Sequence, residues 1–368
     1  MQSVDVIVVG GGVIGLAVAR ALALDGREVV VLERNGRIGE ETSSRNSGVI
    51  HSGIYYPPGS LKAGLCVRGR ELLYAYCAER QIAHARVGKI VVAQIDQVAA
   101  LRALQERGIR NGVTDLQWLS AGEVQALEPR VRCASGLLSP STGIIDVHQY
   151  VVGLWGDLER ADAVVVFRSE MQSARPTAEG MEVTVRSGGE TSTLGCRFMI
   201  NSAGLHAAGL LSRIESYPAG LLRRPYFAKG NYFAYRGSKP FSRLVYPMPN
   251  ESGLGVHATL DIDGSTRFGP DVEWVDAIGY DVDAARVDTF YAAISEYWPS
   301  IPAGTLQPAY AGIRPKLTDA TGKAADFVIE DRAVHGVPGL INLLGIESPG
   351  LTCSLAIAED VLARLGPR

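Results

Sequence analysis

The stretch VDVIVVGGGVIGLAVARALALDGREVVVLER, residues 4–34, decides the fold class of this chain. It opens with an apolar run, Val4 to Val9, of the kind that forms a buried parallel strand. Gly10, Gly12 and Gly15 follow as G-x-G-x-x-G. In this motif the glycines permit a tight turn, a close approach of the backbone to a pyrophosphate, and close packing of helix on strand. The motif therefore predicts a dinucleotide-binding unit at the start of an α/β fold.

The residues after the glycines complete this unit. A helix is expected from about Val13 to Leu24, and its N-terminus would face the phosphates, because the helix dipole and the free N–H groups favour an anion. A second strand, Glu28 to Leu32, ends in Glu33, which stands 23 positions after Gly10. An acid about 20 positions after the first glycine commonly binds the ribose. Strand, glycines, helix, strand and acid together favour dinucleotide binding over a simple glycine turn.

The C-terminal tail favours FAD over NAD, a choice that the glycine motif alone leaves open. No second G-x-G-x-x-G follows a strand, so we expect one redox nucleotide, reduced by the substrate itself. The tail, LINLLGIESPGLTCSLAIAEDVL (340–362), predicts an apolar strand, a turn, and a helix from about Gly350. A second helix N-terminus aimed at the cofactor would stabilise the negative charge of a reduced flavin.

A polar stretch, SSRNSGVIHSGIYYPPGSLKAGLCVRGR (43–70), follows the dinucleotide unit. It is too polar and too rich in glycine for a hydrophobic helix. Because it continues directly from the nucleotide-binding unit, we expect it to wrap the cofactor and to help form a reaction site.

Composition narrows the class of protein. Charged residues make up 20% of the chain and the net charge is −3. The chain therefore lacks the excess of positive charge that is typical of nucleic-acid-binding proteins. No apolar run reaches the ~18 residues of a membrane span, and no basic segment of a signal peptide precedes the first strand. The five cysteines are scattered without a C-x-x-C, which favours a reducing compartment and argues against a structural metal site. We expect a cytoplasmic protein without a metal; peripheral contact with the inner face of a membrane stays open.

The rest of the chain predicts two discontinuous domains: a Rossmann-like FAD-binding domain and a second, mainly antiparallel-sheet substrate domain. Alternating aromatic and polar residues such as YFAKGNYFAY (226–235) favour an antiparallel sheet with one face toward a ligand. The FAD-binding domain is expected to comprise residues 1–85, 147–223 and 309–368, and the substrate domain residues 86–146 and 224–308.

Short motifs along nearly the whole chain carry a family resemblance. They are RNSGVIHSGIYYPPGSLKAGLCVRG (45–69), VGKIVVA (87–93), TGIID (142–146), NSAGLHA (201–207), VYPMP (245–249), LGVHATLDIDG (254–264), AGIRPKL (311–317) and GIESPGLT (345–352). In these motifs the chain resembles the D-amino-acid-oxidase-type flavoprotein superfamily and, within it, the L-2-hydroxyglutarate dehydrogenase/oxidase family. One departure is visible: the family commonly has Arg-Gly, an acid and Tyr where this chain has Lys229-Gly230-Asn231-Tyr232.

The resemblance implies an FAD-dependent oxidoreductase that acts on a CH–OH donor. The expected reaction oxidises an L-2-hydroxy acid, L-2-hydroxyglutarate first of all, to the 2-oxo acid by hydride transfer to flavin N5. Oxygen or a quinone would be the electron acceptor. An alternative is an amine oxidase of the sarcosine or glycine oxidase type, although such enzymes usually lack the HSGIYY run (51–56). A non-redox flavin-binding role fits the concentration of polar residues less well.

The chemistry assigns roles to specific residues. Arg314, in AGIRPKL, resembles the arginine that holds the substrate carboxylate in the superfamily, and a planar guanidinium matches a carboxylate bidentately. His257 is the first candidate for the base that removes the hydroxyl proton and His51 the second, since a histidine with a pKa near 6.5 can accept a proton at neutral pH. His51 would alternatively contact the flavin. Further substrate donors are expected among Lys229, Lys316, Tyr55, Tyr246 and Arg68.

The cofactor contacts follow from the glycine motif and from the resemblance. For the ADP half they are Gly10, Gly12, Gly15, Glu33 and Arg34, and for the phosphates and the flavin ring Thr42, Ser43, Ser44 and Arg45. The resemblance adds Ala203 and Gly204 as a second flavin-binding turn, and Gly345, Ser348, Gly350, Leu351 and Thr352 beside the isoalloxazine.

Overall fold

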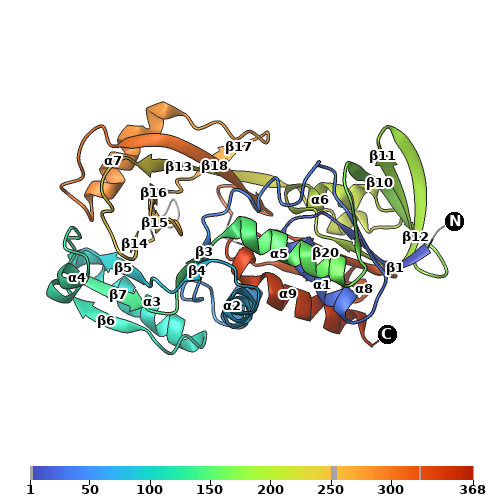
Figure 1. Cartoon of the computed structure of the whole chain (residues 1–368), viewed down its shortest axis with the longest axis horizontal. Coiled ribbons are helices and arrows are strands. Elements are labelled where there is room, and N and C mark those ends of the chain that lie inside the picture. The colour runs from blue at the N-terminus through green and yellow to red at the C-terminus, as the bar shows by residue number, and fades with distance from the viewer. Residues whose placement is uncertain (1–2, 250–254, 323–324, 368) are drawn as a thin grey trace. The chain divides into compact units, whose positions relative to one another are not determined.

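The computed structural model describes residues 3–249, 255–322 and 325–367 (Figure 1). Leu254, the first residue of the LGVHATLDIDG motif, lies outside the described residues. The chain divides into two compact units: unit 1 is Met1–Ser44, Val147–Phe227 and Arg314–Arg368, and unit 2 is Arg45–Asp146 and Ala228–Ile313.

The boundary of the units differs from the predicted domain boundary mainly in residues 45–85, which group with unit 2; in addition, residues 224–227 group with unit 1 and residues 309–313 with unit 2. The cause is a small three-stranded sheet, in which β8 (Gly143–Ile145) pairs with both β3 (Val49–Ile50) and β4 (His84–Ala85). These pairings tie the stretch to a segment about 60–90 residues further along the chain. That unit 1 binds FAD and unit 2 binds the substrate stays a prediction.

The core of unit 1 is a parallel sheet of the dinucleotide-binding type. Its parallel strands lie in the order β9 (Val164–Val166), β2 (Val29–Leu32), β1 (Ser3–Val9), β12 (Glu190–Asn201) and β20 (Leu340–Leu344). If these five parallel strands are numbered by their order in the sequence, they lie in the sheet in the order 3-2-1-4-5, which is typical of the Rossmann fold. Antiparallel strands extend it to eight in the described residues: β10 (Ser169–Pro176), β11 (Met181–Ser187) and β19 (Val328–Glu330). The predicted Rossmann-like domain is confirmed.

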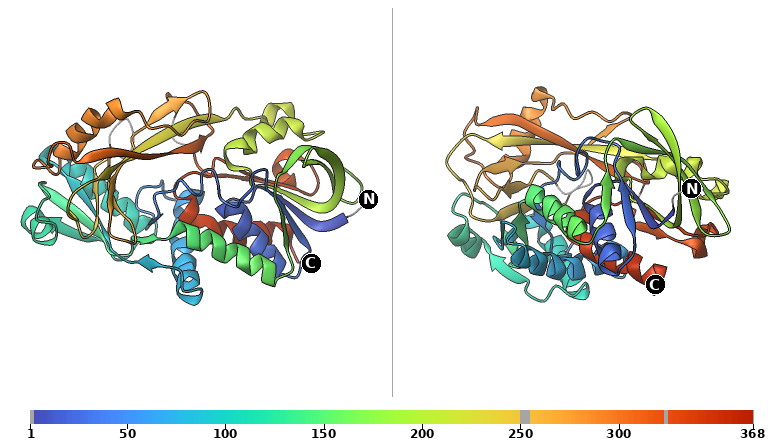
Figure 2. Two further views of the ribbon diagram at one scale, coloured as in Figure 1. Left: turned by 45° about the horizontal axis from the view of Figure 1, so that its top comes forward. Right: turned by 45° about the vertical axis from the view of Figure 1, so that its right-hand side comes forward.

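Three helices of unit 1 pack side by side, α1 (Val13–Leu24) against both α5 (Val147–Arg160) and α9 (Gly350–Leu365) (Figures 1 and 2). The buried side chains of α1 are small or branched and apolar, which allows the helices to pack closely. Three of them are fully buried: Ala17, Val18 and Ala19. The Tyr150 hydroxyl of α5 lies 2.7 Å from Ser354 Oγ of α9, which links these two helices. Two short helices, α6 (Ala207–Leu210) and α8 (Arg332–His335), complete unit 1.

Unit 2 is built on a sheet that has nine strands in the part of the chain that the structure describes. The strand order is β17 (Glu273–Val275), β13 (Tyr226–Tyr235), β16 (Thr266–Phe268), β15 (Ala258–Leu260), β14 (Leu244–Pro247), β5 (Lys89–Ala93), β7 (Ser135–Ser139) and β6 (Gln117–Ser120), with β18 (Leu306–Lys316) beside β13. The sheet is mainly antiparallel, as predicted, but β14 and β5 run parallel. One face packs on α7 (Val287–Ser295), where the rings of Phe233 and Phe290 are 4.5 Å apart.

The polar stretch 43–70 is not one continuous loop. Its second half enters α2 (Leu61–Glu79), which starts at the N-cap Ser60, whose Oγ accepts a hydrogen bond from Ala63 N. Ala63, Cys66 and Leu73 on one side of α2 are buried, so the helix is anchored by spaced apolar residues although its overall composition is polar. The remaining helices of unit 2 are α3 (Val98–Arg110) and α4 (Ala121–Leu127). No helix in the described part of the chain is long and apolar enough to cross a membrane.

Candidate functional site

Two glycines of the motif, Gly10 and Gly15, are required by close backbone packing. Gly10 has φ +109°, and a Cβ there would lie 2.7 Å from the carbonyl oxygen of Ser202. A Cβ on Gly15 would lie 1.9 Å from the carbonyl oxygen of Gly10. Any side chain at either position would push α1 away from the ends of β1 and β12.

Gly12 is less crowded, because a Cβ there would meet a single side-chain atom and no backbone atom. It is the N-cap of α1 without a side-chain hydrogen bond, and a Cβ there would meet only Ser43 Oγ, at 3.2 Å. Val13 N donates to the same Ser43 Oγ over 3.0 Å. Thr42 Oγ1 is buried and has no hydrogen-bond partner among the described residues. An open helix N-terminus beside an unsatisfied hydroxyl fits the pyrophosphate of FAD.

Glu33 stands at the end of β2, where the motif places the ribose-binding acid. Its carboxylate accepts hydrogen bonds from Gly11 N at 2.8 Å and Asn35 N at 2.7 Å, one on each oxygen. Burial raises the pKa of Glu33, and these two hydrogen bonds oppose the rise. Because each carboxylate oxygen keeps a second lone pair, Glu33 can still accept hydrogen bonds from a ribose. The neighbouring Arg34 is held by Glu41 at 3.0 Å.

A second helix N-terminus lies beside the glycine loop within unit 1. Helix α9 begins at Gly350, and a Cβ there would lie 3.9 Å from Ile14 Cδ1 in the first turn of α1. Leu351 and Thr352 are buried. The remaining predicted cofactor contacts of unit 1 lie in turns or at exposed positions. Ser44 Oγ donates a hydrogen bond to the Glu40 carbonyl. The others follow β12 or precede α9: Ala203, Gly204, Gly345 and Ser348. Two positive helix ends close together suit an anionic cofactor.

Arg45 belongs to unit 2 and makes its contacts there. Its guanidinium lies 3.7 Å from the ring centroid of Tyr280, and it donates to the Ala311 carbonyl at 3.3 Å. Its predicted role beside the phosphates and the flavin ring stays a prediction.

Arg314 and Lys316 point to the same face of β18, two residues apart, but differ in their charge partners. Lys316 Nζ lies 2.7 Å from Glu347 Oε1, so its charge is compensated within the protein. Arg314 is half-buried, and its guanidinium has no hydrogen-bond or ion-pair partner in the described residues. A partly buried, uncompensated guanidinium is suited to receive a carboxylate.

The face of the unit 2 sheet opposite α7 carries a cluster of aromatic rings. The rings of Tyr246 and His257 stack at 3.5 Å with an angle of 12°, and both residues are buried. Lys89 Nζ lies 4.5 Å from the ring centroid of Tyr55 and 4.9 Å from that of Tyr246. Burial and the nearby Lys89 charge lower the pKa of His51 to about 3. The structure thus brings together, around Lys89, four residues that were predicted to act in catalysis or substrate binding: Tyr55, Tyr246, His51 and His257. These four residues and Lys89 are called the lysine cluster below.

Sequence reasoning missed Lys89. It used the VGKIVVA motif only as a resemblance and as a predicted strand. The apolar run Ile90 to Ala93 predicts a buried strand, but a lysine at its head is ordinarily expected to remain exposed, so the sequence carried no signal for the burial of Lys89.

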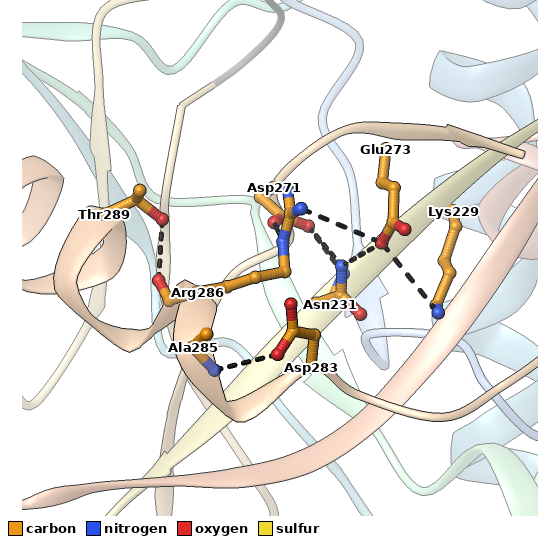
Figure 3. A network of polar contacts seen from close by, with 8 residues as sticks. All are labelled: Lys229, Asn231, Asp271, Glu273, Asp283, Ala285, Arg286 and Thr289. Carbon is orange, nitrogen blue, oxygen red and sulfur yellow. Dashed lines mark hydrogen bonds and ion pairs between the residues drawn. The ribbon is translucent and has the colours of Figure 1, made fainter.

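Lys229, a predicted substrate donor, belongs to a separate charge network (Figure 3). Its Nζ lies 3.8 Å from Glu273. Asn231 Nδ2 donates to Asp271 at 3.0 Å and to Glu273 at 3.0 Å, and Arg286 Nε lies 2.6 Å from Asp271. Two cations and two carboxylates balance one another around a neutral amide. The charge of Lys229 is therefore already compensated in this network.

Comparisons with known proteins agree along nearly the whole chain. Residues 5–365 match the family model "FAD dependent oxidoreductase". The mitochondrial L-2-hydroxyglutarate dehydrogenase of Arabidopsis thaliana is 42% identical over 98% of this chain and 83% of its own, and that of Nematostella vectensis 30% over 99% and 91%. Among solved structures, the dithionite-reduced L-alpha-glycerophosphate oxidase of Mycoplasma pneumoniae with FAD bound superposes with a TM-score of 0.88 at 26% identity, covering 99% of this chain and 95% of that one.

Proposed function

Because the chain belongs to the FAD dependent oxidoreductase family and, within it, to the L-2-hydroxyglutarate dehydrogenases, we propose that it oxidises L-2-hydroxyglutarate to 2-oxoglutarate. The observation that carries the proposal is the similarity to the Arabidopsis enzyme, which extends over almost the entire chain. The glycine loop, the buried Glu33 and the two adjacent helix N-termini fit FAD as the cofactor.

The cofactor would be held by unit 1. Gly12 leaves room for the pyrophosphate at the start of α1, Thr42 and Ser43 offer hydroxyls beside it, and Glu33 accepts from the ribose. FAD, when bound, supplies the acceptor for the hydride that leaves the substrate Cα.

We assign the substrate carboxylate next to the hydroxyl to Arg314. Its guanidinium can make two parallel hydrogen bonds to a carboxylate, which fixes both the position and the orientation of the substrate. The uncompensated charge of Arg314 supports this role, whereas the Glu347 pair makes Lys316 a weaker candidate.

We assign removal of the hydroxyl proton to His257. A general base is most effective when its pKa lies near the working pH. His51 is held neutral with a pKa of about 3, which makes it a weak proton acceptor and favours a role in positioning the flavin instead. The stacked ring of Tyr246 restrains the plane of the His257 imidazole.

Anaerobic mixing of the purified holoenzyme with three compounds tests the function. L-2-Hydroxyglutarate is expected to bleach the flavin, and D-2-hydroxyglutarate and sarcosine to leave it oxidised. Bleaching by sarcosine alone would support an amine oxidase. Stable yellow colour with all three compounds would contradict both activities.

Arg314→Lys should weaken substrate binding without loss of FAD. A forked pair of hydrogen bonds becomes a point charge, which costs on the order of 1.5–3 kcal/mol, or roughly 10- to 150-fold in Kd. The concentration dependence of anaerobic flavin reduction measures this Kd. Arg332→Lys, at an exposed position of α8, is the matched control. An unchanged Kd in Arg314→Lys would remove Arg314 from the carboxylate site.

For the electron acceptor we propose oxygen or a quinone, and for the location the cytoplasm. All five cysteines are free and four of them are buried, which suits a reducing compartment. Burial raises the pKa of Cys77 to about 12, so this thiol resists oxidation. Mixing the reduced enzyme with oxygen or with a soluble quinone identifies the acceptor from the rate of flavin reoxidation.

A further inference from the structure

Lys89 lies on the face of the unit 2 sheet that is turned away from α7. All five residues of β5 are buried, and side chains alternate between the two faces of a strand. Ile90 and Val92 pack into the apolar cluster with Phe290 of α7. Lys89 therefore points to the other face, as does Val91, which packs in a cluster with Tyr246.

The ammonium of Lys89 is fully buried and uncompensated. Its relative exposure is 0%, and Nζ has neither a hydrogen-bond partner nor an ion-pair partner within the described ranges. The two lysines that the sequence predicts to bind the substrate each have an ion-pair partner: Lys229 pairs with Glu273, and Lys316 pairs with Glu347. Burial lowers the pKa of Lys89 to about 7, which reflects the free-energy cost of a charge without a partner.

Aromatic rings hold this ammonium in place without neutralising it. The ring centroids of Tyr55 and Tyr246 both lie within 5 Å of Lys89 Nζ. At this distance a cation is attracted to the face of an aromatic ring. Both tyrosines keep their hydroxyl protons, because burial raises the pKa of each. The lysine cluster thus contains a buried amine, which a bound carboxylate would keep protonated, and two hydroxyl donors, but no acidic side chain.

We propose that Lys89 binds the second carboxylate of a dicarboxylate substrate and so makes this enzyme prefer a 2-hydroxydicarboxylic acid to a 2-hydroxymonocarboxylic acid. The inference rests on the proposed function and adds the residue that sets its substrate class. The substrate supplies the counter-ion that the protein lacks, and the energy gained when the pair forms is available only to ligands that carry this second charge.

The test compares Lys89→Met with the wild-type holoenzyme on two substrates. L-2-Hydroxyglutarate and L-2-hydroxyvalerate share a five-carbon chain, and the second has a methyl group in place of the distal carboxylate. In Lys89→Met we expect the Kd for L-2-hydroxyglutarate, from anaerobic flavin reduction, to rise roughly 10- to 100-fold, the usual worth of a charged hydrogen bond. The Kd for L-2-hydroxyvalerate should change less than about 3-fold, and FAD content should not change.

Controls separate this inference from the proposed function. Lys239→Met, at an exposed position, should leave both Kd values unaltered, and Lys89→Gln should repeat the loss seen in Lys89→Met. An equal loss for both substrates, or a selective loss in Lys229→Met instead, would overturn the inference while the function stands. Failure of both Lys89 variants to fold would also overturn it, because an uncompensated ammonium should not be needed for folding. If L-2-hydroxyglutarate does not reduce the wild-type flavin, the proposed function itself fails.

Discussion

His257→Ala is expected to retain FAD and to slow its reduction by L-2-hydroxyglutarate by roughly 10²–10⁴-fold, the usual contribution of a general base. The loss should become smaller at high pH, where the substrate hydroxyl gives up its proton more readily. Rapid anaerobic mixing across a pH series measures both effects. Thermal unfolding of the same variant reports separately the cost of leaving the Tyr246 ring without its stacking partner.

His51→Ala should behave differently. Because His51 is buried and has a pKa of about 3, we expect its loss to alter the flavin spectrum or the retention of FAD more than the rate of proton removal. His148→Ala, at an exposed position, is the matched control. A fast His257→Ala beside a slow, fully flavinated His51→Ala would reverse the assignment and make His51 the base.

Gly12→Val should yield folded but colourless protein. A Cβ at Gly12 would lie 3.2 Å from Ser43 Oγ, a contact that a small shift of this hydroxyl relieves, and the added methyl groups would occupy the space expected for the pyrophosphate. Visible absorbance measures the flavin, and circular dichroism measures the fold. Gly122→Val, at an open position of α4, is the control and should stay yellow. Full flavin content in Gly12→Val would refute the placement of the pyrophosphate.

Gly15→Val provides a useful contrast to this result. Its Cβ would lie 1.9 Å from the Gly10 carbonyl oxygen, so the variant should lose the packing of α1 on the sheet as well as the cofactor. The glycines of one motif are thus expected to divide into two positions that the packing of the protein requires, Gly10 and Gly15, and one position, Gly12, that the cofactor requires.

The dinucleotide unit could be predicted because its determinants are local. The predicted helix bounds, Val13 to Leu24, are those observed for α1, and the predicted start of the last helix at Gly350 is also the observed one. The second strand was predicted one residue too long, since Glu28 precedes β2. Glycine spacing, an apolar strand and a terminal acid leave few alternative structures for so short a segment.

The surroundings of Lys89 could not be predicted, because they depend on distant pairings. The parallel pairing of β5 with β14 places Tyr246 near a lysine more than 150 residues earlier in the chain. Similarly, residues 45–85 were assigned to the FAD-binding domain because they follow it in sequence, whereas their strands β3 and β4 pair with β8. Helix α2 was also difficult to predict, because the composition of its sequence is polar. Its stability depends on the Ser60 N-cap and on a few buried side chains.

The network of Figure 3 couples position 231 to two acidic neighbours. Asn231 donates hydrogen bonds from one amide nitrogen to Asp271 and to Glu273. An acid at position 231, as is common in the family that this chain resembles, could not donate them and would bring a third carboxylate to two cations. Replacement of Asp271 or Glu273 would relieve this repulsion. We therefore expect position 231 and its two partners to vary together among related chains rather than one at a time.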